Sequence, residues 1–335
     1  MSVPTSTQSS FSRSKFEELM KRKFFYAPSF SIYGGVAGLY DYGPPGCAVQ
    51  TNVMDLWRRH FILAEQMLEV DCSIMTPYKV LETSGHVARF SDYIVKDVKT
   101  GDCFRADHLV EAFFERVLDD PASPAEKQTQ AVTVLAQIDG LDGEALQNLI
   151  TEHQMKSDLG NELTPVAKFN LMFGTDIGPT GYLKGFLRPE TAQGQFVNFK
   201  RLLECNNQRM PFASAMIGKS FRNEISPRSG LLRVREFLMA EIEHYVHPDR
   251  KSHPKFASIS TYKLTLLPAS KQLSGSSETI QMEVGEAVSK GVINNETLGY
   301  FLVRVALFLK AIGIKDDRLR FRQHMPNEMA LMIHI

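Results

Sequence analysis

The sequence has few cysteines, no excess charge of either sign and no long apolar run. Only four of its 335 residues are cysteines, and no two of them form a C-x-x-C pair. This scarcity excludes a disulfide scaffold and a zinc ribbon, and it predicts a chain that folds in a reducing compartment. No apolar stretch approaches the ~18 residues that a membrane-spanning helix needs, so we expect no membrane among its partners.

Its charge and length narrow the class further. Lys and Arg number 38, Asp and Glu also number 38, and the formal net charge is zero. A protein that coats nucleic acid through bulk positive charge is therefore excluded, whereas a local basic groove stays open. At roughly 150 residues per domain, the length predicts about two domains or one large core with an insertion.

The amino terminus carries little information on fold. Residues 1–14 are mostly Ser, Thr, Gln and Pro, with Arg13 as the only charged side chain. This composition predicts a disordered tail. It is poor in acidic residues and rich in Ser, as mitochondrial transit peptides are, but such peptides carry more Arg. We expect a cytoplasmic protein and leave a mitochondrial location open.

Hydrophobic periodicity then divides the chain into a first part at 15–95, a helical insertion at 96–181 and a second part at 182–335. The expected helices span residues 15–25, 48–66, 107–118, 124–138, 143–153, 190–204 and 295–312. The expected strands span residues 70–75, 183–187, 212–222, 233–246 and 317–324. This arrangement predicts an α+β fold built on a mostly antiparallel sheet. Residues 30–46 are rich in Gly and Pro near their end and predict a loop that approaches another segment closely.

Residues 220–245 carry the clearest chemical signal. A turn-rich loop at 226–230 joins two strands, which predicts a hairpin. Because strand side chains alternate, one face of the second strand should carry Arg233, Arg235, Phe237, Met239, Glu241, Glu243 and Tyr245. The opposite face should pack as core apart from its ends.

That first face forms a row of cation, flat apolar surface and anion. Arg222 and Arg233 lie at the mouth of the hairpin, and Phe237 and Glu241 follow at intervals of four residues. Guanidinium groups bind phosphate oxygens, an exposed aromatic ring stacks on a nucleobase, and a carboxylate accepts from an amine. The row is typical of a site for ATP and an amino compound. The alternative is a solvated sheet surface with scattered ion pairs.

At these residues the sequence resembles motif 2 of class II aminoacyl-tRNA synthetases, whose pattern is F-R-x-E, a loop, then R-x-x-x-F. Here the pattern is met by residues 221–224 (FRNE) and 233–237 (RVREF). Three longer segments are similar to glycyl-tRNA synthetases of the eukaryotic and archaeal type: 187–194 (LRPETAQG), 230–243 (GLLRVREFLMAEIE) and 319–330 (LRFRQHMPNEMA). The resemblance runs from about residue 16 to 330 and implies the class II sheet flanked by helices.

The resemblance also implies a reaction and partners. Glycine and ATP would give glycyl-adenylate and pyrophosphate, and the glycyl group would then pass to tRNA(Gly). Residues 48–77 resemble motif 1, which forms the homodimer interface in this class. Residues 96–181 would be the helical insertion of the family.

Site residues follow from the resemblance, position by position. Arg222 would hold the α-phosphate and the glycine carboxylate, and Glu224 would accept from the adenine amino group. Arg233 would contact the γ-phosphate, and Phe237 would stack on adenine. Glu190 and Glu241 would face the glycine ammonium group.

Three further expectations are less specific. Arg188 would bind glycine or, as an alternative, serve the structure alone. Mg²⁺ would bridge the phosphates of ATP, held partly by ATP itself. Glu328 is a candidate ligand for that ion, and its alternative interpretation is a surface charge.

The sequence departs from the family near its end. The G-x-x-x-G-x-x-R-type helix of motif 3 and the anticodon-binding domain are not found in these 335 residues. We therefore expect a truncated chain with an incomplete sheet and weak or no aminoacylation on its own. The alternative is a non-catalytic product that binds ATP weakly or forms a dimer with a full-length subunit.

Overall fold

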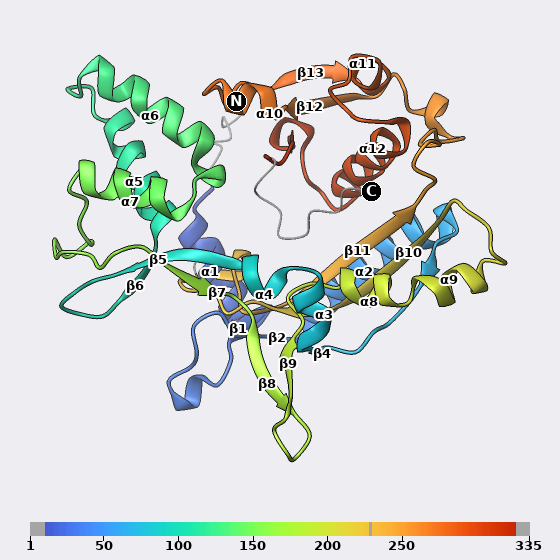
Figure 1. The fold of residues 1–335 in the computed structure, drawn as a ribbon, viewed down its shortest axis with the longest axis horizontal. Coiled ribbons are helices and arrows are strands. Elements are labelled where there is room, and N and C mark those ends of the chain that lie inside the picture. Colours follow the sequence, from blue (N-terminus) through green and yellow to red (C-terminus); the bar gives the residue numbers. More distant parts are fainter. Residues whose placement is uncertain (1–10, 228–229, 326–335) are drawn as a thin grey trace, which may run out of the picture.

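The computed structural model describes residues 11–227 and 230–325 as an α+β fold (Figure 1). The helices are α1 (Arg13–Arg22), α2 (Pro44–Trp57), α3 (Tyr78–Thr83), α4 (His86–Arg89), α5 (Ala106–Asp119), α6 (Ala125–Gln137), α7 (Gly143–Glu152), α8 (Ala192–Val197), α9 (Phe199–Cys205), α10 (Ala269–Leu273), α11 (Val284–Ser289) and α12 (Glu296–Ala311). The strands are β1 (Tyr26–Pro28), β2 (Tyr40–Tyr42), β3 (Leu68–Glu69), β4 (Met75–Pro77), β5 (Ser91–Lys96), β6 (Cys103–Arg105), β7 (Ala167–Asn170), β8 (Phe173–Ile177), β9 (Leu183–Leu187), β10 (Phe212–Phe221), β11 (Glu236–Tyr245), β12 (Lys263–Leu267), β13 (Ile280–Glu283) and β14 (Phe321–Arg322). The pairing is mostly antiparallel, as predicted; β3 with β10 and β12 with β14 are the parallel pairs of the described residues.

The long antiparallel hairpin of β10 and β11 supports the site described below. It confirms the predicted strand pair. One face of this hairpin is covered by α2, by its π-helical continuation Arg58–Leu63 and by α12 (Figure 1). Trp57, Phe61 and Phe308 form the core between these helices and the small side chains of β10. The helices thereby leave the other face of the hairpin available to a site.

A second sheet places the segment that follows β9 beside that other face of the hairpin. It has the order β4-β9-β8, and β9 matches the predicted strand 183–187 residue for residue. At the end of β9 the backbone N–H of Phe221 donates to the carbonyl of Arg188, at 2.9 Å. This bond places residues 188–191 beside the end of β10, directly before α8.

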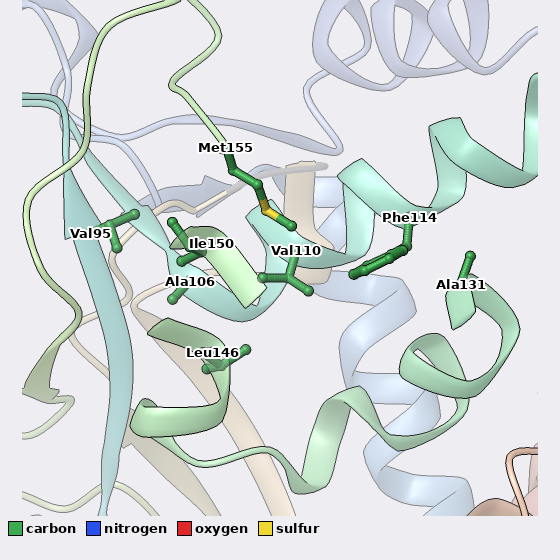
Figure 2. Close-up of a cluster of buried hydrophobic side chains, with 8 residues drawn as sticks. All are labelled: Val95, Ala106, Val110, Phe114, Ala131, Leu146, Ile150 and Met155. Atoms are coloured by element: carbon green, nitrogen blue, oxygen red, sulfur yellow. The ribbon is translucent and has the colours of Figure 1, made fainter. Parts of the chain in front are cut away.

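The insertion has a core of its own (Figure 2). Its three predicted helices are confirmed as α5, α6 and α7. Phe114 and Val110 of α5 pack against Leu146 and Ile150 of α7, and these side chains are almost fully buried. The insertion also contains strands, since β6 and β7 pair with β5 in a sheet of order β6-β5-β7.

The segment after β11 forms a third layer, with a sheet of order β13-β12-β14 packed on α11 and α12. It touches the far end of the insertion. Gln137 Nε2 donates to the carbonyl of Leu273 at 3.2 Å, and Arg322 lies 3.5 Å from Asp139. The insertion and this layer therefore meet on the side away from the hairpin (Figure 1).

Several predicted boundaries are wrong. The strand expected at 70–75 is two short strands, β3 and β4, in different sheets. The strand expected at 317–324 shrinks to β14 because a 3₁₀ turn, Asp316–Arg318, occupies its start. The first helix begins at Arg13, inside the predicted tail, whose residues 1–10 lie outside the described ones.

The face of β11 expected to pack as core is only partly covered. Ile242 packs in the core with α2 and α12, but Leu238 and Ala240 are exposed. They line an apolar groove of about 890 Å³, because the helices cover only one end of this face. Within the described residues, none of the helices combines the length and the apolar composition needed to cross a membrane.

Candidate active site

The opposite face of the hairpin borders a cavity of about 930 Å³, a size typical of small-molecule sites. Its lining includes these predicted site residues: Glu190, Arg222, Glu224, Arg233, Phe237 and Glu241. Phe237 and Glu241 are half-buried at its wall. This face therefore borders a cavity, whereas the alternative interpretation is an open, solvated sheet surface.

The mouth of the hairpin differs from the predicted pattern. β11 begins at Glu236, so Arg233 and Arg235 belong to the preceding loop. The reason is a competing backbone contact, since the N–H of Arg235 donates to the carbonyl of Gly38 at 2.8 Å. Gly38 has a φ of +78°, and a Cβ there would lie 2.8 Å from Pro227, which confirms the predicted close approach of the Gly-rich loop.

Glu190 is held in place by two contacts. Gln193 Nε2 donates to Glu190 Oε1 at 2.6 Å, and His86 Nε2 lies 3.0 Å from the same oxygen. Burial acts to raise the pKa of Glu190, but the contacts with His86 and Gln193 outweigh it, so that its pKa is lowered. Glu190 is therefore ionised and oriented at neutral pH.

Glu241 and Glu243 lie two residues apart on the same face of β11. Glu241 Oε2 accepts from the backbone N–H of Thr191 at 3.0 Å and from the Thr191 hydroxyl at 2.6 Å. Burial raises the pKa of Glu241 despite these bonds. Burial, with the nearby charges of Glu241 and Glu190, raises the pKa of Glu243 to about 8.

Glu243 should make the stability of the chain depend on pH. Its pKa in the folded state lies above the ordinary value of Glu, so folding favours its protonated form, and stability should fall as pH rises from about 4.5 to 8. Glu243→Gln removes that loss, and we expect its Tm at pH 8.5 to exceed that of the parent chain by about 2–4 °C or more. The difference should vanish near pH 5. Equal melting curves at both pH values would contradict the assignment.

Arg222 lies between two aromatic rings. Its guanidinium carbon is 5.2 Å from the centroid of Phe90 and 5.4 Å from that of Phe237. Its Nε donates to the carbonyl of Pro189 at 3.2 Å, which ties it to the residue before Glu190. Cation–π contact on both sides limits the movement of the guanidinium and leaves its outer nitrogens available to an anion.

Glu224 and Arg233 occupy the end of the cavity nearest the insertion. Glu224 is 8% exposed, and its Oε2 has no hydrogen-bond partner within the described residues. Arg233 Nη1 contacts His108 Nε2 of α5 at 2.9 Å. A buried acceptor without a partner is costly unless a donor reaches it, as a bound amino group would.

Four residues of the site were missed by sequence reasoning: His86, Phe90, Asp92 and Arg105. Arg105 pairs with Asp92 at 2.7 Å and with Asp107 at 2.5 Å, and both Asp92 and Arg105 line the cavity. They lie on α4, directly after it, on β5 and on β6, far in sequence from the hairpin. No periodicity links them to it, because tertiary packing alone brings these segments to the cavity.

Arg188 lies behind the cavity. Its Nη1 donates to the carbonyl of Cys72 at 2.6 Å and its Nε to the carbonyl of Lys219 at 2.8 Å. Gly218 makes room for it, since a Cβ there would lie 2.2 Å from Nη2. These contacts support the structural alternative for Arg188. Glu328, the candidate metal ligand, lies outside the described residues.

Relatives of the chain are numerous, although no family model matches it. A putative glycine–tRNA ligase of Schizosaccharomyces pombe is 53% identical over 97% of this chain and 55% of its own length. The mitochondrial glycine–tRNA ligase 1 of Saccharomyces cerevisiae is 54% identical over 96% of this chain and 51% of its own length. A putative cytoplasmic glycine–tRNA ligase of Arabidopsis thaliana is 47% identical over 93% of this chain and 67% of its own length.

Among solved structures, a threonyl-tRNA synthetase domain from Cryptosporidium parvum aligns with a TM-score of 0.40 at 15% identity, over 77% of this chain and 47% of that one. The family assignment rests on the sequence relatives alone. This chain spans about half the length of most of them. Its identity to them extends over nearly all of its own residues, and the chain therefore belongs to the glycine–tRNA ligase family.

Proposed function

We propose that this chain forms the part of a glycine–tRNA ligase that binds ATP and glycine and joins them as glycyl-adenylate. The observation that carries the proposal is one cavity in which a guanidinium group, an aromatic ring and two carboxylates follow one another. These groups are Arg222, Phe237, Glu190 and Glu241. Membership of the family supports the same reaction.

ATP would lie across the hairpin in a bent form, with its base and its γ-phosphate both toward the insertion. Adenine would stack on Phe237, whose ring already carries the flat guanidinium of Arg222 at 5.4 Å. The unpartnered Oε2 of Glu224 would accept from the adenine amino group. Arg222 would bind the α-phosphate, and Arg233 would turn from His108 to the γ-phosphate.

Glycine would bind between α8 and β11. Its ammonium group would face Glu190 and Glu241, and Glu241 accepts two hydrogen bonds from Thr191, the residue that follows Glu190. Such a site selects the smallest amino acid by steric exclusion, because glycine offers no side chain to recognise.

The chemistry needs no nucleophile from the protein. A carboxylate oxygen of glycine attacks the α-phosphorus, the bond to the bridging oxygen breaks, and pyrophosphate leaves with the electron pair. The ribose hydroxyl of tRNA(Gly) then attacks the carbonyl carbon, and AMP leaves. Arg222 lowers the barrier of the first step by stabilising charge at the α-phosphate and by holding both reactants in line.

The described residues do not form a magnesium cage. Within residues 11–227 and 230–325, no three His, Cys, Asp or Glu side chains gather closely enough to hold a metal ion. We therefore propose that Mg²⁺ enters as the ATP complex, and we assign it no ligand from this part of the chain.

Phe237→Ala tests the base position. Loss of the stacking surface should weaken ATP binding by about 1–3 kcal/mol, measured by isothermal titration. Leu238→Ala is the matched control, because Leu238 lies next in sequence on the opposite, exposed face of β11. Equal ATP affinity of Phe237→Ala and the parent chain would contradict the proposed base position and favour the alternative interpretation, a solvated sheet surface.

Activity of the 335 residues alone is a separate matter. We expect weak glycine-dependent ATP–pyrophosphate exchange, since motif 3 is not found in them. ATP binding without exchange would favour the alternative, a non-catalytic product, and mass measurement of mixed dimers would test pairing through 48–77 with a full-length subunit. Robust exchange would refute the expectation of impairment.

The names of related enzymes include both a cytoplasmic and a mitochondrial glycine–tRNA ligase. For this chain we propose a cytoplasmic location.

A further inference from the structure

His86 is a buried histidine that the proposed reaction has not used. It is the first residue of α4 and is 0% exposed. Its Nδ1 lies 2.8 Å from the Ser84 hydroxyl, and its Nε2 lies 3.0 Å from Glu190 Oε1. Nε2 makes no well-formed hydrogen bond within the described residues, so its contact with Glu190 is a close polar approach.

The neighbours of the two ring nitrogens of His86 constrain which nitrogen carries a hydrogen. A carboxylate oxygen only accepts, so a stable contact with Glu190 needs a hydrogen on Nε2. The Ser84 hydroxyl has one hydrogen, which can go to Nδ1, at 2.8 Å, or to the carbonyl of Leu81, at 3.3 Å. Donation to Nδ1 leaves the ring hydrogen on Nε2, as the contact with Glu190 requires. Ser84, His86 and Glu190 thus form a chain directed toward the cavity.

Glu190 has two acidic neighbours in the same cavity. The charged or titratable groups that face it are Arg222, Glu241, Glu243 and His86. Burial and mutual repulsion raise the pKa of Glu241 and of Glu243, whereas the pKa of Glu190 is lowered. The pKa of Glu190 differs from those of Glu241 and Glu243 because, of these three carboxylates, Glu190 is the one that His86 and Gln193 contact.

The backbone of α4 is anchored well enough to hold the ring. Asn170 Nδ2 donates to the carbonyl of Val87 at 3.0 Å, and the N–H of Leu171 donates to the carbonyl of Phe90 at 3.1 Å. The ring of Phe90, the residue after α4, lies 5.4 Å from the His86 ring and 5.2 Å from the guanidinium carbon of Arg222. The segment 86–90 therefore contacts both an anion and a cation of the site.

We propose that His86 is a positioning residue, which keeps Glu190 ionised and aimed at the substrate ammonium group. This inference rests on the proposed function, in which Glu190 receives glycine. It assigns His86 no contact with the substrate. Its role is to select Glu190, among three neighbouring carboxylates, as the one that carries a fixed negative charge.

The test compares two inert analogues of glycyl-adenylate. One is 5′-O-(N-glycylsulfamoyl)adenosine. The other is 5′-O-(N-acetylsulfamoyl)adenosine, in which a hydrogen replaces the ammonium group. Titration of the full 335-residue chain at pH 6 and pH 8 gives the ratio of their affinities, which isolates the ammonium site from the nucleotide site. In His86→Leu we expect this ratio to fall about tenfold, and more at pH 6, with unchanged affinity for the acetyl compound. His86→Gln, whose amide nitrogen can reach the position of Nε2, should retain most of the ratio.

The outcomes separate the two proposals. If the parent chain binds neither analogue, the proposed function fails and the inference with it. If the parent chain prefers the glycyl compound and His86→Leu prefers it equally at both pH values, the inference alone is overturned. Equal loss of both compounds in His86→Leu would make His86 structural and also overturn it. If His86→Leu does not fold, Ser84→Ala decides, with an expected loss of about threefold and with no loss as the contradicting result.

Discussion

Replacing Arg222 by alanine should slow the formation of glycyl-adenylate by about 100- to 1,000-fold. The guanidinium is held between Phe90 and Phe237 and leaves its outer nitrogens to the cavity. Its Nε donates to the carbonyl of Pro189, the residue before Glu190, so the guanidinium is tied to the segment that carries a carboxylate of the site. A single-turnover assay with excess protein, labelled ATP and glycine would measure the rate even for a slow chain.

The control for this variant lies three residues earlier, on the strand that Arg222 directly follows. Lys219 of β10 is exposed and pairs with Glu236 on the surface. Lys219→Ala should leave the rate within about twofold, because an exposed ion pair contributes little. Arg222→Lys should recover only part of the loss, because an ammonium group cannot make the paired, planar contacts of a guanidinium. Equal rates in Arg222→Ala and the parent chain would remove Arg222 from the reaction.

Phe114→Ala should be the most destabilising change in the insertion. Phe114 is 1% exposed and belongs to the core formed by α5, α6 and α7, where it lies on the side of Ala131 in Figure 2. Truncation of a fully buried Phe costs about 3–5 kcal/mol in transfer and cavity energy. Urea unfolding followed by circular dichroism would measure the loss.

The same variant also tests whether the insertion belongs to the site. Asp92, Arg105 and His108 reach the cavity from the insertion or its base, so its loosening should weaken ATP binding as well. Val132→Ala, at an exposed position of α6, should change stability by no more than about 0.5 kcal/mol and leave ATP binding unchanged. Full ATP affinity in a destabilised Phe114→Ala chain would confine the site to the hairpin.

Much of the fold could be predicted because long periodic segments carry their own signal. The hairpin, strand 183–187 and the helices of the insertion follow from local pattern. β3 and β14 could not be predicted, because two-residue strands depend on the neighbouring strand rather than on their own sequence. The exposure of Leu238 also lay beyond the sequence, since alternation marks a face as apolar without showing what covers it.

The residues of the candidate site that lie on the hairpin could be predicted from the sequence, but those that reach it from other segments could not. Arg222, Phe237 and Glu241 share one strand pair, so their spacing could be read directly. Their placement around one cavity agrees with that prediction, while their roles toward ATP and glycine stay predictions. His86 and Phe90 could not be found in this way, because only the packing of α4 brings them to Glu190 and Arg222.

The central claim is that a nucleotide lies across the hairpin, base on the phenyl ring and amino acid between the carboxylates. A crystal structure of this chain with 5′-O-(N-glycylsulfamoyl)adenosine tests it most directly. We predict adenine stacked on Phe237 with its amino group at Glu224, and the ammonium nitrogen within hydrogen-bond distance of Glu190 or Glu241. A ligand bound elsewhere, with Phe237 untouched, would contradict the account.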